Sequence, residues 1–500
     1  MSLIALAAVL STMHYEGEVS TTGGDFMEVA FVVPAGTQEI EIQHADGSDF
    51  VILDWGVWGP SSEFRGWGGG NSEDIVIGVA QSSRSYLPGP IAPGTWTVVI
   101  GKALLGTTGN MYTFDVTCRS DATLPVQPRA EYTPVVLAPE RRWYAGDFHV
   151  HSTESGDARA SFAEIHTLAR SRGLDFVNLS DHNTTSQHAL IAALQPTMPD
   201  LLFLRGAEIT TYKGHGNSVG MSSYVDHRIG LNNRTIVGVL DDLAAQNALF
   251  IVNHAALDLG DVCIGCAWKH PDTPWDKVAA IEIITGNYEI SERGFTPRVL
   301  ELWDAQLALG HRIAAVGGSD DHDAGMSTGP TASPIGSPTT LVLADALSEA
   351  AIIAAIAQGR TMVKLHAPDD PDLEVTMRRA DGTSAEIGDG VDGVAQVQLA
   401  VHITRGATTF VQLWRDGEQL QSVEVTSDEF TTTLTDAPGA MARRYRVEII
   451  NNGGNRLVVT SHFYVAGIAG DDGCGCRSST PTAGFASLLV LGLVLRRRRS

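Results

Sequence analysis

Histidines and carboxylates recur in short motifs in the middle of this 500-residue chain, each motif following an apolar run. The side chains able to bind a metal ion are His149, His151, Asp157, His182, Glu208, His215, His254, Asp320 and His322. Residues i and i+2 of a strand share a face, so His149 and His151 can chelate one ion, as can Asp320 and His322. Mixed imidazole and carboxylate ligands suit Zn²⁺, Mn²⁺ or Fe²⁺ rather than Ca²⁺. Nine such residues exceed the needs of one ion, so we expect two or three ions that share a bridging carboxylate.

Apolar strands and helices alternate around these residues. Strands are expected at 146–151, 174–180, 201–210, 248–255, 280–286 and 312–320. Helices are expected from a capping box at Ser161 and Glu164 to Gly173, in the stretch that ends at Leu194, at 235–246 and at 297–309. The alternation predicts parallel β/α units over residues 141–366, with an α/β barrel as the leading closure. The candidate ligands then fall at the carboxyl ends of strands, where such barrels place their active sites.

A single His-x-His pair would be a weak sign of a metal site, because histidine is common at intermediate burial. Here five separate strand ends carry a suitable residue, and burying so many polar groups without ions or partners would be costly. We therefore expect a metal centre. His215 lies in a glycine-rich stretch, KGHGN, whose path the sequence does not define.

The regions on both sides of 141–366 have short apolar runs broken by Gly and Pro, which is typical of all-β structure. They predict a β-sandwich at 14–120, a Pro-rich linker at 121–140 and a second β-sandwich at 370–467. In the second sandwich, Asp416 and Gly417 predict a hairpin turn. The expected fold class is thus multidomain, an α/β barrel flanked by two all-β domains.

Acidic residues outnumber basic ones, 58 Asp and Glu against 34 Lys and Arg, which gives a net charge of −24. Such a surface repels a phosphate backbone, so stable binding of duplex nucleic acid is not expected.

Cys263 and Cys266 form a C-x-x-C pair. In an exported protein a local disulfide is expected between them. With His270 nearby, the pair could instead bind a further Zn²⁺, although a fourth ligand is not apparent.

Both ends of the chain bear on its location. Residues 1–13 include an apolar run without preceding basic residues, which suggests a truncated signal segment or an ordinary strand. Residues 471–500 hold Cys474 and Cys476, an apolar stretch from 484 to 495, and four arginines at 496–499. The stretch is shorter than the roughly 20 residues that a spanning helix needs. This order of features resembles the myxobacterial C-terminal sorting tag. The resemblance implies processing at the cysteines and attachment at the cell surface or outer membrane. The alternative is an unstructured tail with an apolar end.

Five motifs occur in the order found in the PHP (polymerase and histidinol phosphatase) superfamily. They are GDFHVHS at 146–152, LSDHN at 179–183, GAEIT at 206–210, VNHA at 252–255 and GGSDDH at 317–322. This resemblance implies a distorted seven-stranded barrel with up to three ions, bound by the nine residues named above, and Glu208 as the bridge. The first loop departs from the usual pattern because Gly156 displaces Asp157 by one place. The phrases WGVWGP, YLPGPIAPGTW and CIGCAW are similar to the branch that contains bacterial carbaryl hydrolase.

The resemblance implies a hydrolase that activates water with metal ions and acts on a small phosphoester, such as a nucleotide or another small phosphate ester. The closer branch implies a carbamate or carboxylic ester instead, and a non-catalytic surface-binding protein is the alternative of another class. Asp181, next to His182, is a candidate to orient a ligand or accept a proton. Lys213 and Arg293 are candidates to hold an anionic group, or else solvated surface charges.

Overall fold

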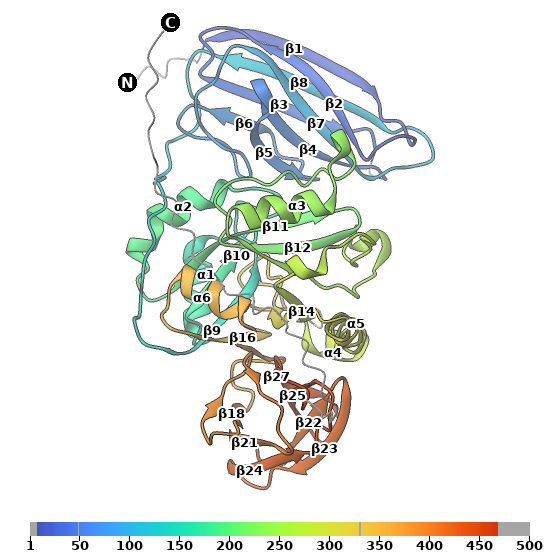
Figure 1. Cartoon of the computed structure of the whole chain (residues 1–500). Helices are drawn as coiled ribbons and strands as arrows, with labels where there is room; N and C mark the ends of the chain where they lie inside the picture. The colour runs from blue at the N-terminus through green and yellow to red at the C-terminus, as the bar shows by residue number, and fades with distance from the viewer. Residues whose placement is uncertain (1–7, 49, 330–331, 469–500) are drawn as a thin grey trace, which may run out of the picture.

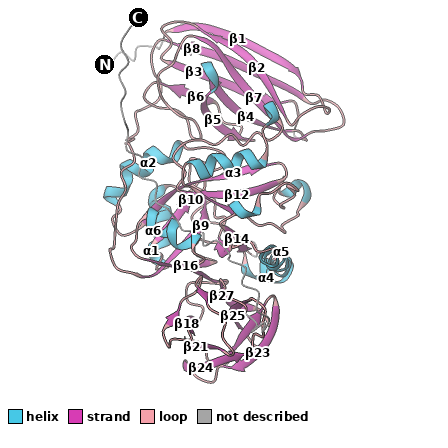
Figure 2. Ribbon diagram, in the orientation of Figure 1, coloured by secondary structure: helices cyan, strands magenta, loops and turns pink. Residues whose placement is uncertain are grey.

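Three parts follow one another along the chain, which this computed structural model describes at residues 8–48, 50–329 and 332–468. In Figure 1 the N-terminal strands lie at one end, the C-terminal strands at the other, and the middle region between them. Within the described residues, the α-helices all belong to the middle region, and Figure 2 shows helices in cyan around the strands of this region. The chain is therefore mixed α/β with a large share of sheet, as its sequence predicts.

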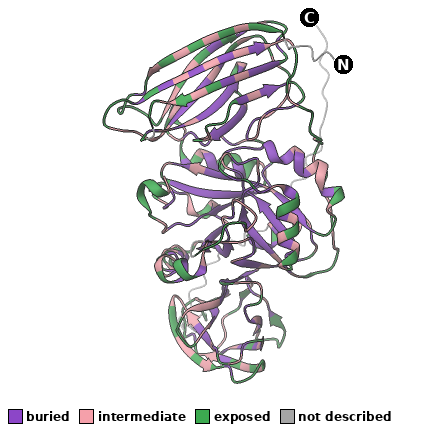
Figure 3. Cartoon of the chain, turned by 180° about the vertical axis from the view of Figure 1, so that it is seen from behind, coloured by how far each residue is buried: buried purple, intermediate pink, exposed green. Residues whose placement is uncertain are grey.

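The N-terminal part consists of two four-stranded antiparallel sheets with the orders β1-β8-β3-β6 and β2-β7-β4-β5. The strands are β1 (Val9–Glu18), β2 (Phe26–Val33), β3 (Glu39–Asp46), β4 (Ile52–Gly59), β5 (Glu63–Gly69), β6 (Ile75–Gly78), β7 (Gly94–Leu104) and β8 (Met111–Arg119). Both sheets contribute to one apolar core, which contains the fully buried Phe31, Trp55, Trp96 and Phe114. Exposed and covered residues alternate along β1, and Figure 3 shows this striping on the outer strands.

The predicted N-terminal segment at 1–13 overlaps the first strand, because residues 9–13 begin β1, which pairs with β8 in antiparallel register. Residues 1–7 lie outside the described residues.

The middle sheet has the order β15-β14-β13-β12-β11-β10-β9-β16-β17. Its strands are β9 (Arg142–Val150), β10 (Phe176–Leu179), β11 (Leu202–Thr211), β12 (Gly214–Val219), β13 (Leu249–Val252), β14 (Ala280–Thr285), β15 (Ala314–Gly318), β16 (Thr339–Ala344) and β17 (Thr361–Lys364). The strands β9, β10 and β11 are parallel, as are β13, β14 and β15. The strand β12 is antiparallel to both neighbours, which the expectation of all-parallel units did not include.

Helices of the middle region cover this sheet. They are α1 (Phe162–Ser171), α2 (Ser186–Leu194), α3 (Ile236–Ala245), α4 (Tyr288–Gly294), α5 (Thr296–Ala308) and α6 (Glu349–Ala357). Short 3-10 turns are η1 (Pro60–Ser62), η2 (Gln195–Thr197), η3 (Leu231–Asn233), η4 (Gly260–Val262) and η5 (Trp275–Lys277). The predicted capping box is confirmed, because the Ser161 side chain accepts from the Glu164 amide and Glu164 bonds back to the Ser161 amide.

The two ends of the parallel set approach each other without a continuous ladder. Beyond β15, the backbone amide of Asp320 donates to the His149 carbonyl oxygen at 2.8 Å. The backbone amide of His151 donates to the Asp321 carbonyl oxygen at 3.0 Å. One isolated parallel bridge, between Val150 and Asp321, accompanies these bonds. A closed barrel is therefore not shown, although the strand ends that carry the candidate ligands are drawn together.

The C-terminal part continues the middle sheet. Its strands are β18 (Asp372–Arg378), β19 (Ser384–Ala385), β20 (Gly390–Val391), β21 (Val397–Thr404), β22 (Phe410–Arg415), β23 (Glu418–Glu424), β24 (Glu429–Asp436), β25 (Arg443–Ile450), β26 (Arg456–Thr460) and β27 (Phe463–Val465). The strand β26 pairs with β17, so the path runs on through β25, β22 and β23, while β19-β18-β21-β24 form a second sheet. The boundary predicted near residue 370 thus falls within one continuous hydrogen-bonded sheet.

The hairpin predicted at Asp416 and Gly417 is confirmed. Arg415 pairs with Glu418, and the two turn residues have φ angles of 52° and 90°, as a tight turn of this kind requires.

In the described part of the chain, no helix is both long enough and apolar enough to span a bilayer. The expected sorting tag at 471–500, with Cys474 and Cys476, lies outside the described residues.

Candidate metal centre

The nine residues singled out by the sequence come together at one end of the middle sheet. His149 is near the end of β9, Glu208 is on β11 and His215 is on β12; His151, Asp157, His182, His254, Asp320 and His322 lie in loops that follow β9, β10, β13 and β15. The carboxyl ends of β9, β10, β11, β13 and β15 and the amino end of β12 lie on this side, so side chains far apart in sequence reach one space. His215 reaches it from β12, a strand that the sequence did not indicate.

One group consists of His149, His151, Glu208 and Asp320, whose ligand atoms all lie within 4.8 Å of one another. Nε2 of His149 is 3.1 Å from Oδ1 of Asp320 and 3.3 Å from Oε2 of Glu208. Nε2 of His151 is 3.2 Å from the same Asp320 oxygen. Two imidazoles and two carboxylates at this spacing form a complete donor set for a divalent ion.

A second group shares His151 and adds His182 and His322. The Asp157 carboxylate closes it, because Oδ2 of Asp157 is 3.3 Å from Nε2 of His182 and 3.4 Å from Nε2 of His322. Asp157 therefore faces the site in spite of its displaced position in the loop. Its side chain is 56% exposed, which leaves this side of the site open.

A third group lies on the other side of Glu208. Oε1 of Glu208 is 3.4 Å from Nδ1 of His215 and 3.2 Å from Nε2 of His254. Its second oxygen, Oε2, faces His149, and it also lies 3.0 Å from Nδ1 of His182. Glu208 thus presents one oxygen to each of two sets of imidazoles, which is the arrangement of a bridging carboxylate.

The electrostatics of the centre reflect this crowding. Burial opposes ionisation of Glu208, but the imidazoles of His149 and His182 hold its pKa well below the usual range. Burial lowers the pKa of His151 to about 3, helped by the neighbouring His322 and His182. The ionised Glu208 and the neutral His151 are in the protonation states that metal ligands need. Nearby carboxylates hold the pKa of His149 and of His182 well above the usual range although burial opposes this, so a bound ion would have to displace a proton from these two rings.

Unpaired ring nitrogens show that the donor set fits a metal ion. Nε2 of His149 and both ring nitrogens of His151 are buried and make no hydrogen bond within the described residues. Leaving buried polar atoms unpaired is costly, and a divalent ion between the rings and carboxylates would satisfy the two Nε2 atoms.

Backbone strain accompanies the ligands. His254 and Asp320 have φ angles of 26° and 58°, in the left-handed region that non-glycine residues rarely adopt. Such conformations persist where the surrounding structure imposes them, and they cluster at functional sites.

The sequence did not indicate the side chains that orient these ligands. Glu282 is fully buried on β14; its Oε1 is 2.9 Å from Nδ1 of His149, and its Oε2 accepts the His254 amide at 3.1 Å. The Thr210 hydroxyl oxygen lies 2.6 Å from Nδ1 of His182, and the Asn253 side-chain amide donates to Oε1 of Glu208 at 2.9 Å. The sequence contained one sign of the role of Glu282, because an acidic residue stands within the otherwise apolar strand AIEIIT.

Three predicted roles are corrected. Asp181 accepts from the Ser152 amide and hydroxyl at 2.6 and 2.9 Å, which fixes the loop after β9, and it makes no hydrogen bond to a candidate ligand. Lys213 is exposed and does not line the cavity over the site. Arg293 is 68% exposed on α4 and lies 3.8 Å from Glu289, so solvent and a helix neighbour satisfy its charge.

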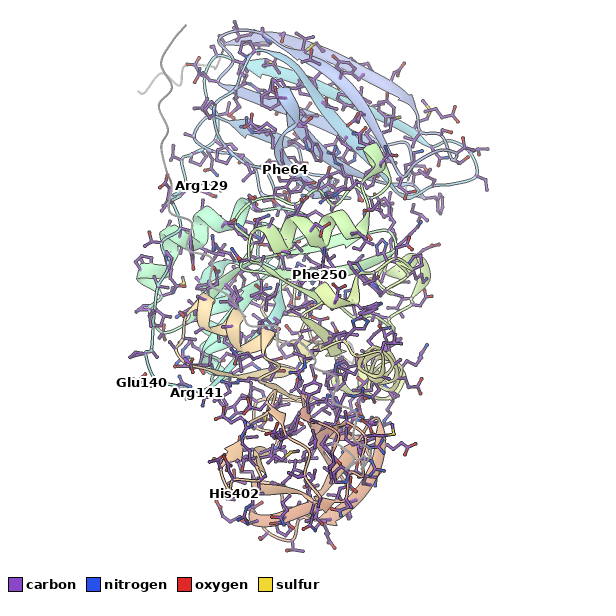
Figure 4. All side chains as sticks on the ribbon, in the orientation of Figure 1. Phe64, Arg129, Glu140, Arg141, Phe250 and His402 are labelled. Carbon is purple, nitrogen blue, oxygen red and sulfur yellow. A yellow bond between two sulfur atoms is a disulfide. The ribbon has the colours of Figure 1, made fainter. Side chains whose placement is uncertain are left out.

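The cavity over the centre has a volume of about 600 Å³ and lies where the N-terminal part meets the middle region. Phe26, Ile52, Trp67 and Tyr212 give it an apolar wall. No Lys or Arg lines it within the described residues. Phe64 stacks on Tyr224 with ring centroids 3.5 Å apart, and Figure 4 labels Phe64 at this boundary.

The N-terminal part reaches the loop that holds Asp157. Ser85 donates to the Glu154 carbonyl oxygen at 2.8 Å, and Arg84 donates to that of Ala158 at 2.7 Å. A Cβ atom at Gly156 would overlap the Gly68 carbonyl oxygen. Gly156, the departure noted in the first loop, is thus the residue that lets the β5 backbone approach the site.

Cys263 and Cys266 are joined by a disulfide, and Cys266 Sγ lies within 4.8 Å of a ring nitrogen of both His215 and His254. His270, the other residue considered for a zinc site, bonds to Thr211 Oγ1 at 2.8 Å.

Neither a family model nor a curated protein matches the chain. Among solved structures, the chain is similar to a two-domain protein from Bacteroides vulgatus that contains a predicted PHP-like metal-dependent phosphoesterase; the identity is 18% and the TM-score 0.36, over 68% of this chain and 100% of that one. It is also similar to a candidate metal-dependent phosphoesterase from Bifidobacterium adolescentis, with 14% identity and a TM-score of 0.24 over 38% of this chain and 92% of that one.

Proposed function

We propose that the chain is a metal-dependent hydrolase of the PHP superfamily that cleaves a small phosphoester. The observation that carries the proposal is the arrangement around Glu208, whose two oxygens face separate sets of imidazoles at 3.0 to 3.4 Å. We propose two or three divalent ions, Zn²⁺ or Mn²⁺, with Fe²⁺ as an alternative. When bound, such ions lower the pKa of water to near neutrality and stabilise negative charge on the substrate.

The protein's own side chains set the geometry for this chemistry. Glu282 holds the outer nitrogen of His149, so the inner nitrogen is directed at Asp320 and Glu208. Thr210 contacts the His182 ring. Groups of this kind fix the ring orientation and tautomer of a ligand.

A second candidate is hydrolysis of a carbamate or carboxylic ester. A phosphate monoester carries about two negative charges at pH 7. In a cavity whose described lining residues include no Lys or Arg, only the ions would neutralise them. The apolar wall of Phe26, Ile52 and Trp67 favours a substrate with an uncharged, apolar group.

A substrate panel separates these candidates. The purified full chain, loaded with Zn²⁺ or Mn²⁺, is assayed on a phosphate monoester, a phosphodiester, a nucleotide and an aryl carbamate. The highest kcat/KM on a phosphate compound supports the first candidate, and the highest on the carbamate supports the second. Metal-loaded protein that turns over none of them contradicts both and favours a non-catalytic surface-binding protein.

We propose further that the protein is exported and attached to the cell surface or outer membrane through residues 471–500. The sequence order of cysteines, apolar stretch and arginines supports this. Cell fractionation with the native chain and a Cys474→Ser/Cys476→Ser variant tests it. The native chain is expected with the envelope and the variant elsewhere; equal distribution contradicts the proposal.

A further inference from the structure

The segment from Gly260 to Cys266 forms part of the cavity wall beside the third ligand group. It begins with the 3-10 turn η4 and ends at the disulfide between Cys263 and Cys266. Val262, Cys263, Ile264 and Cys266 all line the cavity. We call residues 260–266 the disulfide loop.

Two backbone carbonyl groups of the disulfide loop face ligand imidazoles. The Ile264 oxygen is 3.1 Å from Nε2 of His215, and the Cys266 oxygen is 3.0 Å from Nδ1 of His254. A carbonyl oxygen only accepts, so these two nitrogens carry the protons. In the neutral rings the other nitrogens, Nδ1 of His215 and Nε2 of His254, then carry the lone pairs that an ion would use.

Both of these nitrogens face one atom. Nδ1 of His215 and Nε2 of His254 lie 3.4 and 3.2 Å from Oε1 of Glu208. The disulfide loop therefore sets the tautomer and the ring orientation of two of the three side chains that would hold one ion. The groups that orient the two rings are backbone carbonyl groups, so a side-chain substitution at Ile264 or Cys266 would not remove them.

The two ends of the disulfide loop differ in how they are held. After the loop, the backbone amide of Trp268 donates to the Ala255 carbonyl oxygen at 3.0 Å, and that of Lys269 donates to the Lys213 carbonyl oxygen at 2.6 Å. At its start, Leu259 just before the loop is 43% exposed and Val262 within it is 87% exposed. The disulfide ties the exposed end to the anchored one and so removes alternative conformations of the loop. Gly265, with φ +76°, packs its backbone against Thr211, which places the Ile264 carbonyl group.

We propose that the Cys263–Cys266 disulfide is a positioning element for the ion site of His215, His254 and Glu208, and that its reduction selectively weakens this site. The proposal rests on the metal centre of the proposed function. Reduction adds two electrons and two protons and gives two thiols. With a water-soluble phosphine as reductant, phosphorus takes an oxygen atom from water and becomes the phosphine oxide.

Selectivity follows from the contacts of the second group. The ring nitrogens of His182 and His322 contact Asp157, Thr210, Glu208 and the Asp320 carbonyl oxygen. Within the described residues, neither ring is hydrogen-bonded to the disulfide loop. Loosening the loop should therefore leave this group intact.

Co²⁺ alone serves as the probe, because its absorption reports on ligands and its amount is measured by elemental analysis. The full-length apoprotein is titrated with Co²⁺ before and after phosphine reduction, with the reductant removed and oxygen excluded. The Cys263→Ser/Cys266→Ser variant is titrated without reductant. Cys118→Ser, which changes the buried free cysteine of the N-terminal part, is the matched control.

Reduction, or the double serine substitution, is expected to lower the affinity for one Co²⁺ ion by about 10- to 100-fold, the usual effect of losing a group that orients a ligand. The other ions should keep their affinity. In a His322→Ala background the reduced protein should still lose this ion. In a His254→Ala background, where the same site is already broken, reduction should have no further effect.

Unchanged Co²⁺ affinities after reduction overturn the proposal. A loss of Co²⁺ affinity on reduction that is as large in the His254→Ala background as in the native chain also overturns it. A sulfur-to-cobalt charge-transfer band in the reduced protein also overturns it, because Cys266 would then be a ligand itself. Oxidised apoprotein that binds no Co²⁺ contradicts the proposed function as well. Circular dichroism of the double variant checks that it folds.

Discussion

His151 belongs to two of the ligand groups, and both of its ring nitrogens are buried without a hydrogen-bond partner in the described residues. His151→Ala is therefore expected to lose at least one ion and nearly all turnover. Metal content by elemental analysis and kcat/KM on the best substrate test this. The control is His402→Ala in the C-terminal part, whose side chain pairs with Glu374 and Glu429 and which Figure 4 labels far from the site. A His151→Ala variant that keeps its full metal content would contradict the assignment.

Glu282 orients His149 without facing the cavity over the site. Glu282→Gln keeps the shape of the side chain but removes its charge and one of its two acceptor oxygens. The affinity for one ion is expected to fall by about 10- to 100-fold. Competition with a chelator measures it. Glu289→Gln, on the exposed face of α4, is the matched control and should leave the affinity unchanged; an equal effect of both substitutions would refute the role.

Asp181 has its pKa raised from 3.8 to about 7, because burial disfavours its charged form. A folded-state pKa above the unfolded value contributes stability that is present at low pH and lost as the pH rises. The loss should fall between about pH 4 and pH 7. Asp181→Asn cannot ionise, so the free energy of unfolding of its apoprotein should decline less over this range than that of the native chain. Urea unfolding at several pH values measures the difference, and parallel curves would contradict the assignment.

The sequence identified ligands more readily than the groups that orient them. Apart from His215, the candidate ligands stand in motifs at the ends of apolar strands, and the carboxyl ends of neighbouring parallel strands meet, so their convergence could be predicted. Glu282 stands inside an apolar strand, and Thr210 and Asn253 are ordinary strand-end residues. Their roles depend on which strands are neighbours, which a single sequence does not specify.

At the scale of elements, β12 is a strand that the sequence does not predict. Its sequence GHGNSV has only Val219 among the β-branched and aromatic residues that favour strands, and it forms because β11 and β13 pair with it on both sides. Gly216 allows the close approach of Phe250. Tertiary pairing outweighs local preference here, and His215 reaches the centre only through this strand.

The loop after β9 was expected to hold Asp157 less securely because of Gly156. The structure gives a reason for the glycine, since the Gly68 carbonyl oxygen occupies the space of its missing side chain. Gly156→Ala should push the N-terminal part away from the site and lower the free energy of unfolding by about 1–3 kcal/mol. KM should rise more than kcat falls, because the apolar wall moves while the ligands stay.

Gly24→Ala is the control for this prediction, because a Cβ atom there would meet nothing within 4 Å. Chemical unfolding and steady-state kinetics of both variants provide the test. A Gly156→Ala protein with native stability and native KM would show that the close approach is unimportant.

At the scale of the whole molecule, the middle region and the C-terminal part share a sheet and buried ion pairs. Arg446 is 2% exposed and contacts Asp304 of α5 at 2.7 Å. Asp304→Asn removes the charge of one partner, while Glu448 stays 2.8 Å from Arg446, so it should destabilise the chain by about 1–3 kcal/mol. Because β17 and β26 are paired, both parts should unfold in one calorimetric transition that shifts as a whole. Asp345→Asn, 79% exposed, is the control; two separate transitions, only one of which shifts, would contradict the coupling.

The pairing of β17 with β26 also bears on how the chain tolerates shortening. A protein ending near residue 366 would retain every candidate ligand, yet it would expose the amide and carbonyl groups of Met362, Val363 and Lys364 that β26 now covers. An uncovered strand edge is a template for pairing with other chains. Gene fragments that stop after the candidate ligand motifs should thus yield insoluble aggregates, because the C-terminal strands protect this edge of the middle sheet.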